Sequence, residues 1–135
     1  MKTDFEVIDL VYTIINDSTV TDLIDGSIWK SKKPLGRKVK DIVINLSSNV
    51  LQDDQLIQIA YFNINTYCEK NKGGTFKKAT LQPIITAILV LLAAYNQTGN
   101  TYFFLEVTNP GSVFNDEIDK TMSFANIRVT GYVES

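Results

Sequence analysis

The amino-acid sequence predicts an α+β fold, in which two main helices pack on one face of a mostly antiparallel sheet of about five strands. Three observations lead to this class: an amphipathic period at the N-terminus, an apolar run over residues 83–95, and β-branched segments that alternate with a period of two. The expected order is helix, short helix, three strands, helix and two strands. With 135 residues and no linker rich in Ser, Gly or Pro, residues 1–135 are expected to form a single domain.

The first helix is expected to begin after Thr3. Thr3 and Glu6 have the spacing of a capping box, in which each side chain satisfies a backbone amide at the helix start. Apolar residues then recur at steps of three and four, namely Phe5, Ile8, Val11 and Ile15. A second, short helical turn is predicted over Val20–Ile24, because Gly26 is a natural C-terminal residue for it.

Three strands are predicted next, because the period of the sequence changes to two. Ser27–Lys30 is expected to be a short strand, residues 31–40 a solvated loop, and Asp41–Leu46 a second strand. The third strand, about Gln55–Cys68, is similarly apolar on both faces over its first half, which predicts cover on both sides there. Short connections predict that consecutive strands pair antiparallel.

The second main helix is predicted to follow a turn over Asn71–Lys78. We expect Thr80 to cap it, Pro83 to lie in its first turn, and Asn96 to be near its end. The apolar run from Pro83 to Tyr95 is shorter than the roughly twenty residues that span a bilayer, so it is interpreted as a buried core helix. Because it is apolar almost all round, it should also touch the first helix or a neighbouring subunit.

Two strands complete the predicted sheet. Tyr102–Thr108 is expected to be the fourth strand, and residues 109–111 (Asn-Pro-Gly) are expected to open a loop that carries several carboxylates. Met122–Glu134 is expected to be the last strand, because apolar residues alternate along it.

Charge is sorted unevenly along the chain, although the formal net charge is only −2. Ten of the 13 Lys and Arg residues fall in segments 30–40 and 70–78, whereas the first 25 residues hold six carboxylates and a single lysine. Sorted charge of this kind indicates surface contacts and favours a binding or assembly subunit. The candidate contact residues are Lys30, Lys32, Lys33, Arg37, Lys38, Lys40, Lys70, Lys72, Asp116, Glu117 and Asp119.

Histidine and paired cysteines, which many catalytic and metal sites use, are missing from the sequence. The sequence has no histidine, the commonest general base and metal ligand, and its single cysteine, Cys68, excludes an internal disulfide. Residues 116–119 lack the spacing of a calcium loop, and the Gly73–Gly74 pair lacks the order of a phosphate-binding loop. We therefore expect no enzymatic activity, no cofactor and no metal.

Three interpretations of the basic segment 30–40 stay open. It can be a solvated loop whose lysines prevent unwanted edge pairing, a contact with an acidic face of another subunit, or a contact with DNA phosphates. Trp29 is the only aromatic residue near these cations, and the segment is neither helical nor repetitive, unlike many nucleic-acid-binding surfaces. A small accessory nucleic-acid-binding protein that uses segments 30–40 and 70–78 is the alternative function.

The order of elements and several short phrases resemble the tail-terminator (tail-completion) proteins of long-tailed bacteriophages and prophages. The phrases are Asp22–Trp29, Asp41–Asn45, Asn63–Tyr67 and Ile127–Val133, with Pro34 in the loop between the first two. The resemblance implies a structural protein of the virion neck, of which six copies close into a ring at the head-proximal end of the tail. Such a ring stops tail-tube polymerisation and joins the tail to the head connector.

The same resemblance implies the partners. They are the chain itself in a ring, the tail-tube protein, the head-connector or head-closure protein, and DNA that passes through the lumen without sequence-specific binding. No membrane contact is implied, and the protein would be assembled in the bacterial host cytoplasm and lie at the tail–head junction of the virion. A head-to-tail ring needs two complementary faces on each subunit, which Lys32, Lys33, Arg37 and Lys38 could supply by facing carboxylates next door.

Overall fold

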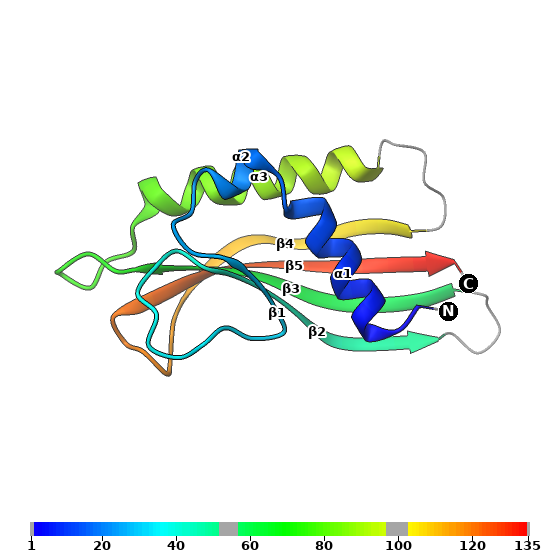
Figure 1. Cartoon of the computed structure of the whole chain (residues 1–135), viewed down its shortest axis with the longest axis horizontal. Helices are drawn as coiled ribbons and strands as arrows, with labels where there is room; N and C mark the ends of the chain where they lie inside the picture. Colours follow the sequence, from blue (N-terminus) through cyan, green and yellow to red (C-terminus); the bar gives the residue numbers. More distant parts are fainter. Residues whose placement is uncertain (1, 52–56, 97–102, 135) are drawn as a thin grey trace.

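The computed structural model describes residues 2–51, 57–96 and 103–134, and it confirms the α+β class (Figure 1). Its elements in chain order are α1 (Asp4–Ile15), α2 (Ser18–Thr21), β1 (Ile28–Lys30), β2 (Ile42–Leu51), β3 (Ile57–Glu69), α3 (Lys78–Asn96), β4 (Phe103–Asn115) and β5 (Met122–Glu134). The five strands form one sheet in the order β1-β2-β3-β5-β4.

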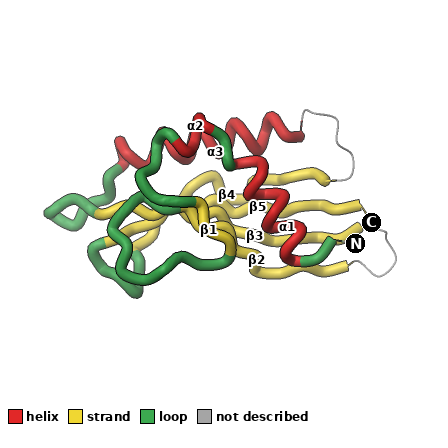
Figure 2. Tube along the Cα trace, in the orientation of Figure 1, coloured by secondary structure: helices red, strands yellow, loops and turns green. Residues whose placement is uncertain are grey.

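Both main helices lie on the same face of this sheet, as predicted (Figure 2). α1 packs over β1 and β2, whereas α3 packs over β3, β4 and β5. The core between the two layers is apolar, because every second residue of each strand points towards the helices. Its fully buried members include Val7, Val11 and Ile15 of α1, Ile84 and Ile88 of α3, and Ile44, Phe62, Ile64, Ile127 and Val129 of the strands.

The pairing of β1 differs from the prediction, because β1 runs parallel to β2 and not antiparallel. Antiparallel neighbours can be joined by a tight turn, but residues 31–41 are long enough to carry the chain back to the start of β1. There the Ile42 amide donates to the Ser27 carbonyl at 2.9 Å and the Gly26 amide donates to the Lys40 carbonyl at 3.1 Å. The other three strand pairs are antiparallel.

Two strands are longer than predicted. β2 continues past Leu46 to Leu51 through a bulge, and β4 continues past Thr108 to Asn115. The predicted loop at residues 109–111 is wrong, because these residues lie within β4, which has bulges on both sides of Pro110. β4 is an edge strand, where a residue without an N–H is tolerated, so proline did not end the strand.

The helices lie where the sequence predicted them, but the bounds of α2 and the start of α3 differ from the prediction. The capping box of Thr3 and Glu6 is present at α1. α2 is shorter and earlier than the predicted turn, because the Asp17 side chain accepts a hydrogen bond from the Thr19 amide and caps it. α3 begins at Lys78, before the predicted cap at Thr80, so Pro83 lies beyond its first turn.

α3 buries one face and exposes another. Its buried residues are Leu81, Ile84, Ile88 and Leu92, and no charged residue occurs from Ala79 to Asn96. By length and composition alone the helix could cross a membrane, but its buried face packs into the core of the sheet. The predicted first residues of the third and fourth strands, Gln55 and Tyr102, lie outside the described residues.

Candidate functional site

Three loops gather at one end of the sheet and bring the two basic segments together (Figure 1). They are residues 31–41, residues 70–77, and the β4–β5 hairpin at 116–121, and we call this region the loop end. The Lys70 amide donates to the Thr121 carbonyl at 2.9 Å, and Lys38 Nζ donates to Thr121 Oγ1 at 2.7 Å. Segments that are far apart in sequence therefore form one charged surface.

Asp41 is the residue that fixes the basic loop. Its side chain is fully buried, and its Oδ1 accepts hydrogen bonds from the Ser27 amide at 2.8 Å and from Trp29 Nε1 at 2.9 Å. Arg37 donates to both carboxylate oxygens, at 2.9 and 3.2 Å, and stacks over the Trp29 ring. Gly26 is needed beside this carboxylate, because a Cβ at position 26 would lie 2.2 Å from Asp41 Oδ1.

Asp41 makes the stability of the chain depend on pH. Burial alone would raise the pKa of Asp41, but hydrogen bonds from Arg37, Ser27 and Trp29 outweigh burial and hold the pKa below the ordinary value of 3.8. The unfolded chain therefore takes up this proton at a higher pH than the folded chain. The stabilising contribution is complete above the unfolded-state pKa and is lost as the pH falls through the folded-state pKa.

We expect the free energy of unfolding to fall below about pH 4 more steeply in the wild-type chain than in Asp41→Asn, which has no carboxylate to protonate there. Urea unfolding curves at several acid pH values measure how the free energy of unfolding changes with pH in each chain. The same pH dependence in both chains would contradict the role of Asp41. The comparison isolates Asp41, because the other carboxylates are common to both chains.

A salt bridge joins the basic loop to the acidic hairpin. Lys38 Nζ donates to Asp119 Oδ2, and the Thr121 amide and hydroxyl donate to Asp119 Oδ1. The Lys38 ammonium, with Thr121, lowers the pKa of Asp119 to about 2. Two of the three segments that carry the candidate contact residues are therefore tied together within one chain.

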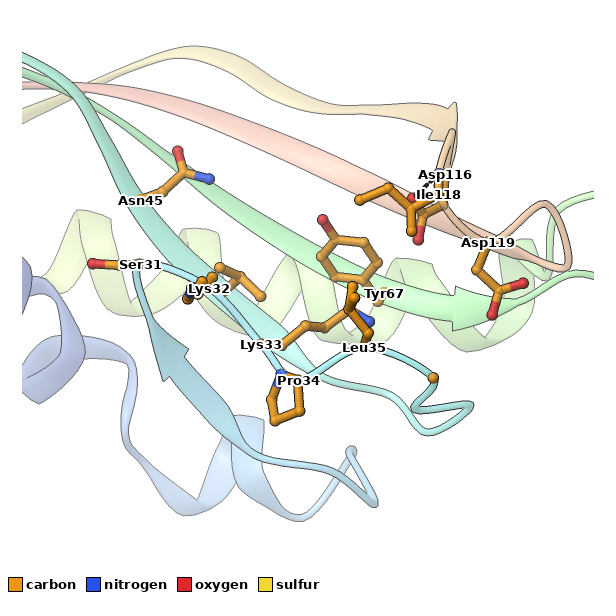
Figure 3. A pocket seen from close by; sticks show the side chains of 12 residues that line it. Ser31, Lys32, Lys33, Pro34, Leu35, Asn45, Tyr67, Asp116, Ile118 and Asp119 are labelled. Carbon is orange, nitrogen blue, oxygen red and sulfur yellow. Dashed lines mark hydrogen bonds between the residues drawn. The ribbon is translucent and has the colours of Figure 1, made fainter.

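A pocket of about 490 Å³ lies between the basic loop and the hairpin (Figure 3). Tyr67 stands between the two sides, and Lys33 Nζ lies 4.7 Å from the centre of its ring. Leu35 and Ile118 project at the rim, with 77% and 79% of their surface exposed. The pocket thus offers apolar contact with charged groups around it. The described residues contain no group of His, Cys, Asp and Glu side chains that could hold a metal ion.

The structure distributes the predicted contact residues over different environments. Lys30 pairs with Asp9 on α1 at 2.8 Å, Arg37 with Asp41, and Lys38 with Asp119, so these three cations have partners within the chain. In the described part of the chain, the remaining candidates form no ion pair. They are Lys32, Lys33, Lys40, Lys70, Lys72, Asp116 and Glu117. For these residues, contact with a partner stays a prediction.

The organising role of Asp41 and Trp29 was not predicted from the sequence. Asp41 was interpreted as the first residue of a strand, and Trp29 as an aromatic residue near cations. The available signal was the spacing of Arg37 and Asp41, four residues apart at the start of a β-branched run. Cys68 is buried, and burial raises the pKa of its thiol, which agrees with a structural role.

The helix-free face of the sheet carries a ladder of amide side chains. Asn63 Nδ2 donates to Asn45 Oδ1 at 3.1 Å, while Asn126 Nδ2 donates to Asn63 Oδ1 and Asn65 Oδ1 at 3.0 and 2.7 Å. Aromatic pairs lie on either side of this amide ladder, Tyr67–Phe124 and Phe114–Phe124 towards the loop end and Phe104–Tyr132 towards the opposite end.

Cover on both faces of β3 was predicted, and for the described chain this is wrong. The helices cover one face only, so Ile57 and Tyr61 are exposed at the end opposite the loop end. The apolar composition of this uncovered stretch therefore has no explanation within one described chain.

The chain matches no protein-family model, and no curated protein sequence is similar to it.

Proposed function

We propose that this protein is a non-enzymatic assembly subunit that forms a ring with copies of itself at the head-proximal end of a bacteriophage tail. The ring would stop tail-tube polymerisation and join the tail to the head connector. The structure has the α+β fold predicted from the sequence, and the candidate site consists of surface contacts and a pocket between two loops. The polymerisation stop, the ring of six and the location in the virion come from the resemblance.

One observation supports this proposal best: the two ends of the sheet differ in chemistry. The loop end carries three charged loops, with Leu35 and Ile118 exposed at its pocket. The opposite end exposes other large apolar side chains, among them Phe5, Leu51 and Ile57. A ring subunit that separates two different partners needs two different ends. Copies arranged with their strands along the ring axis would present all loop ends on one rim and all apolar ends on the other.

The proposal predicts that the chain associates into discrete, closed particles. Multi-angle light scattering over a wide range of concentrations is expected to show a large species of fixed mass, and electron microscopy is expected to show rings, free or at the ends of tail tubes. A chain that stays monomeric at high concentration and does not bind tube ends would contradict the proposal.

A second candidate function is supported by the gathering of both basic segments at the loop end. Lys32, Lys40, Lys70 and Lys72 form no ion pair within the described residues, so this surface could bind a polyanion. Binding of DNA or RNA would then weaken steeply with salt, because bound counterions are released from the phosphates. The sequence pI of about 5.0 argues against this function. Gel shifts at several salt concentrations separate the two candidates.

A further inference from the structure

In the part of the chain that the structure describes, two edge stretches of the sheet pair with no further strand at the end opposite the loop end. On one side, β1 pairs only with Ile42–Ile44 of β2, so among the described residues the outer side of Asn45–Leu51 has no backbone partner. On the other side, β4 is the edge strand, and its first stretch, Phe103–Val107, precedes the bulges around Pro110. Free edges of this kind offer backbone N–H and C=O groups to a further strand.

The register places these two stretches in the same rows across the sheet. Val50 is opposite Ile59, Ile59 is opposite Tyr132, and Tyr132 is opposite Phe104. This row is apolar throughout and lies on the helix-free face. Its two ends are the most open, since Val50 is 47% exposed and Phe104 is 50% exposed. A neighbouring sheet that continued the row would cover both side chains.

The strand directions also allow the sheet to continue into a second copy. β4 is antiparallel to β5, β5 to β3, and β3 to β2, so β4 and β2 run in opposite directions. A second copy that is rotated about an axis along the strands keeps all its strand directions. Its β2 would therefore meet β4 of the first copy as an antiparallel neighbour, the arrangement already used by the three central pairs.

One position on the β4 edge is occupied by a side chain. The Leu105 amide donates to Asn96 Oδ1 at 3.0 Å, and Asn96 Nδ2 donates to the Leu105 carbonyl at 2.6 Å. A carboxamide has the same donor and acceptor as a peptide group. Asn96, the last residue of α3, thus takes the place of one residue of a neighbouring strand.

We infer that copies of this chain join edge to edge, with Phe103–Val107 of one copy pairing antiparallel with Asn45–Leu51 of the next. Asn96 blocks this edge in the lone subunit and releases Leu105 when the second copy arrives. β1 on one edge, and Pro110 with its bulges on the other, confine the pairing to the end opposite the loop end. The contact uses two different surfaces, so it can repeat around a closed ring. This inference rests on the self-assembly proposed above.

A pair of cysteines tests the contact directly. In a chain carrying both Val50→Cys and Phe104→Cys, the two positions are separated by three strand spacings, about 14 Å, too far for an internal disulfide. Every new bond must therefore link two copies. Oxidation is expected to give a ladder of covalent multimers on a non-reducing gel. Cys68 is buried and is common to all variants.

The single variants are the matched controls. Val50→Cys alone and Phe104→Cys alone are expected to give no ladder, because equivalent positions do not meet in a head-to-tail contact. Efficient dimers from either single variant would indicate a symmetric contact and would overturn the inference. A double variant that associates without forming a ladder would overturn it too, and would leave the proposed function in place.

Asn96→Ala tests the blocking role. Removing the carboxamide leaves Leu105 free to pair, so the concentration at the midpoint of self-association is expected to fall about ten-fold. Val50→Lys is expected to raise this midpoint, whereas Val90→Lys, on the exposed face of α3, is expected to leave it unchanged. An unchanged midpoint in Asn96→Ala would overturn the blocking role. If neither the wild-type chain nor Asn96→Ala associates at any concentration or at tube ends, both the inference and the proposed function fail.

Discussion

Asp41→Ala is expected to lower the free energy of unfolding by about 3 to 4 kcal/mol, because Asp41 is the buried partner of a partly exposed ion pair and the acceptor of two further hydrogen bonds. The Ser27 amide and Trp29 Nε1 would lose their partner, and Arg37 would keep its charge beside a cavity. Arg37 retains part of its hydration, since about a third of its side chain is exposed, which keeps the loss below that of a fully buried pair.

Urea denaturation at neutral pH measures this loss. Asp22→Ala is the matched control, because Asp22 is an exposed carboxylate in the same part of the chain and should change stability little. A loss of less than about 1 kcal/mol in Asp41→Ala would show that the basic loop does not depend on this carboxylate. The pH dependence of unfolding in the wild-type and Asp41→Asn chains tests the role of the same carboxylate independently.

Phe62→Ala is expected to cost about 3 to 5 kcal/mol, the range for a truncated aromatic residue in a core. Phe62 is fully buried in the centre of β3, and its ring, together with that of Phe103, lies over Gly131 of β5. The cavity left by alanine would lie between α3 and the sheet, where rigid strands cannot close it. The loss should therefore appear as reduced stability of the whole domain.

Tyr61→Ala is the control for this second prediction. Tyr61 is the neighbour of Phe62 in sequence but points to the helix-free face and is exposed. Its replacement should cost much less, although both variants lose an aromatic ring from the same strand. Thermal unfolding followed by circular dichroism compares the two chains, and equal losses would show that the helix-free face is buried in solution.

Local patterns were enough to predict most elements. The capping box of Thr3 and Glu6 involves residues three apart, and the alternation along β5 is a property of the strand itself, so both are visible in the sequence. The start of α3 and the continuation of β4 through Pro110 were not predicted. In α3, Pro83 was expected in the first turn but lies beyond it. In β4, Pro110 was expected to end the strand, but an edge strand does not need every amide.

The sequence predicts which charged residues the loop end contains, but it does not predict which of them contact one another. The charge clusters are plain in the sequence, yet the partner of Lys38 is Asp119, 81 residues away, and nothing local indicates that the basic loop faces the hairpin. The parallel pairing of β1 was missed for the same reason, because it depends on Asp41 holding Ser27 and Trp29. Contacts that join distant segments are fixed by the fold as a whole.

The amide ladder of the helix-free face has a consequence for the alignment of the strands. A slip of two residues between β3 and its neighbours would keep apolar side chains on the same faces, so hydrophobic alternation alone does not exclude it. The same slip would place Tyr61 opposite Asn45 in one direction, or Tyr67 opposite Asn126 in the other, so an amide of the ladder would lose a partner in either case. The polar centre of this apolar face therefore selects one strand register among several that the hydrophobic core would accept equally well.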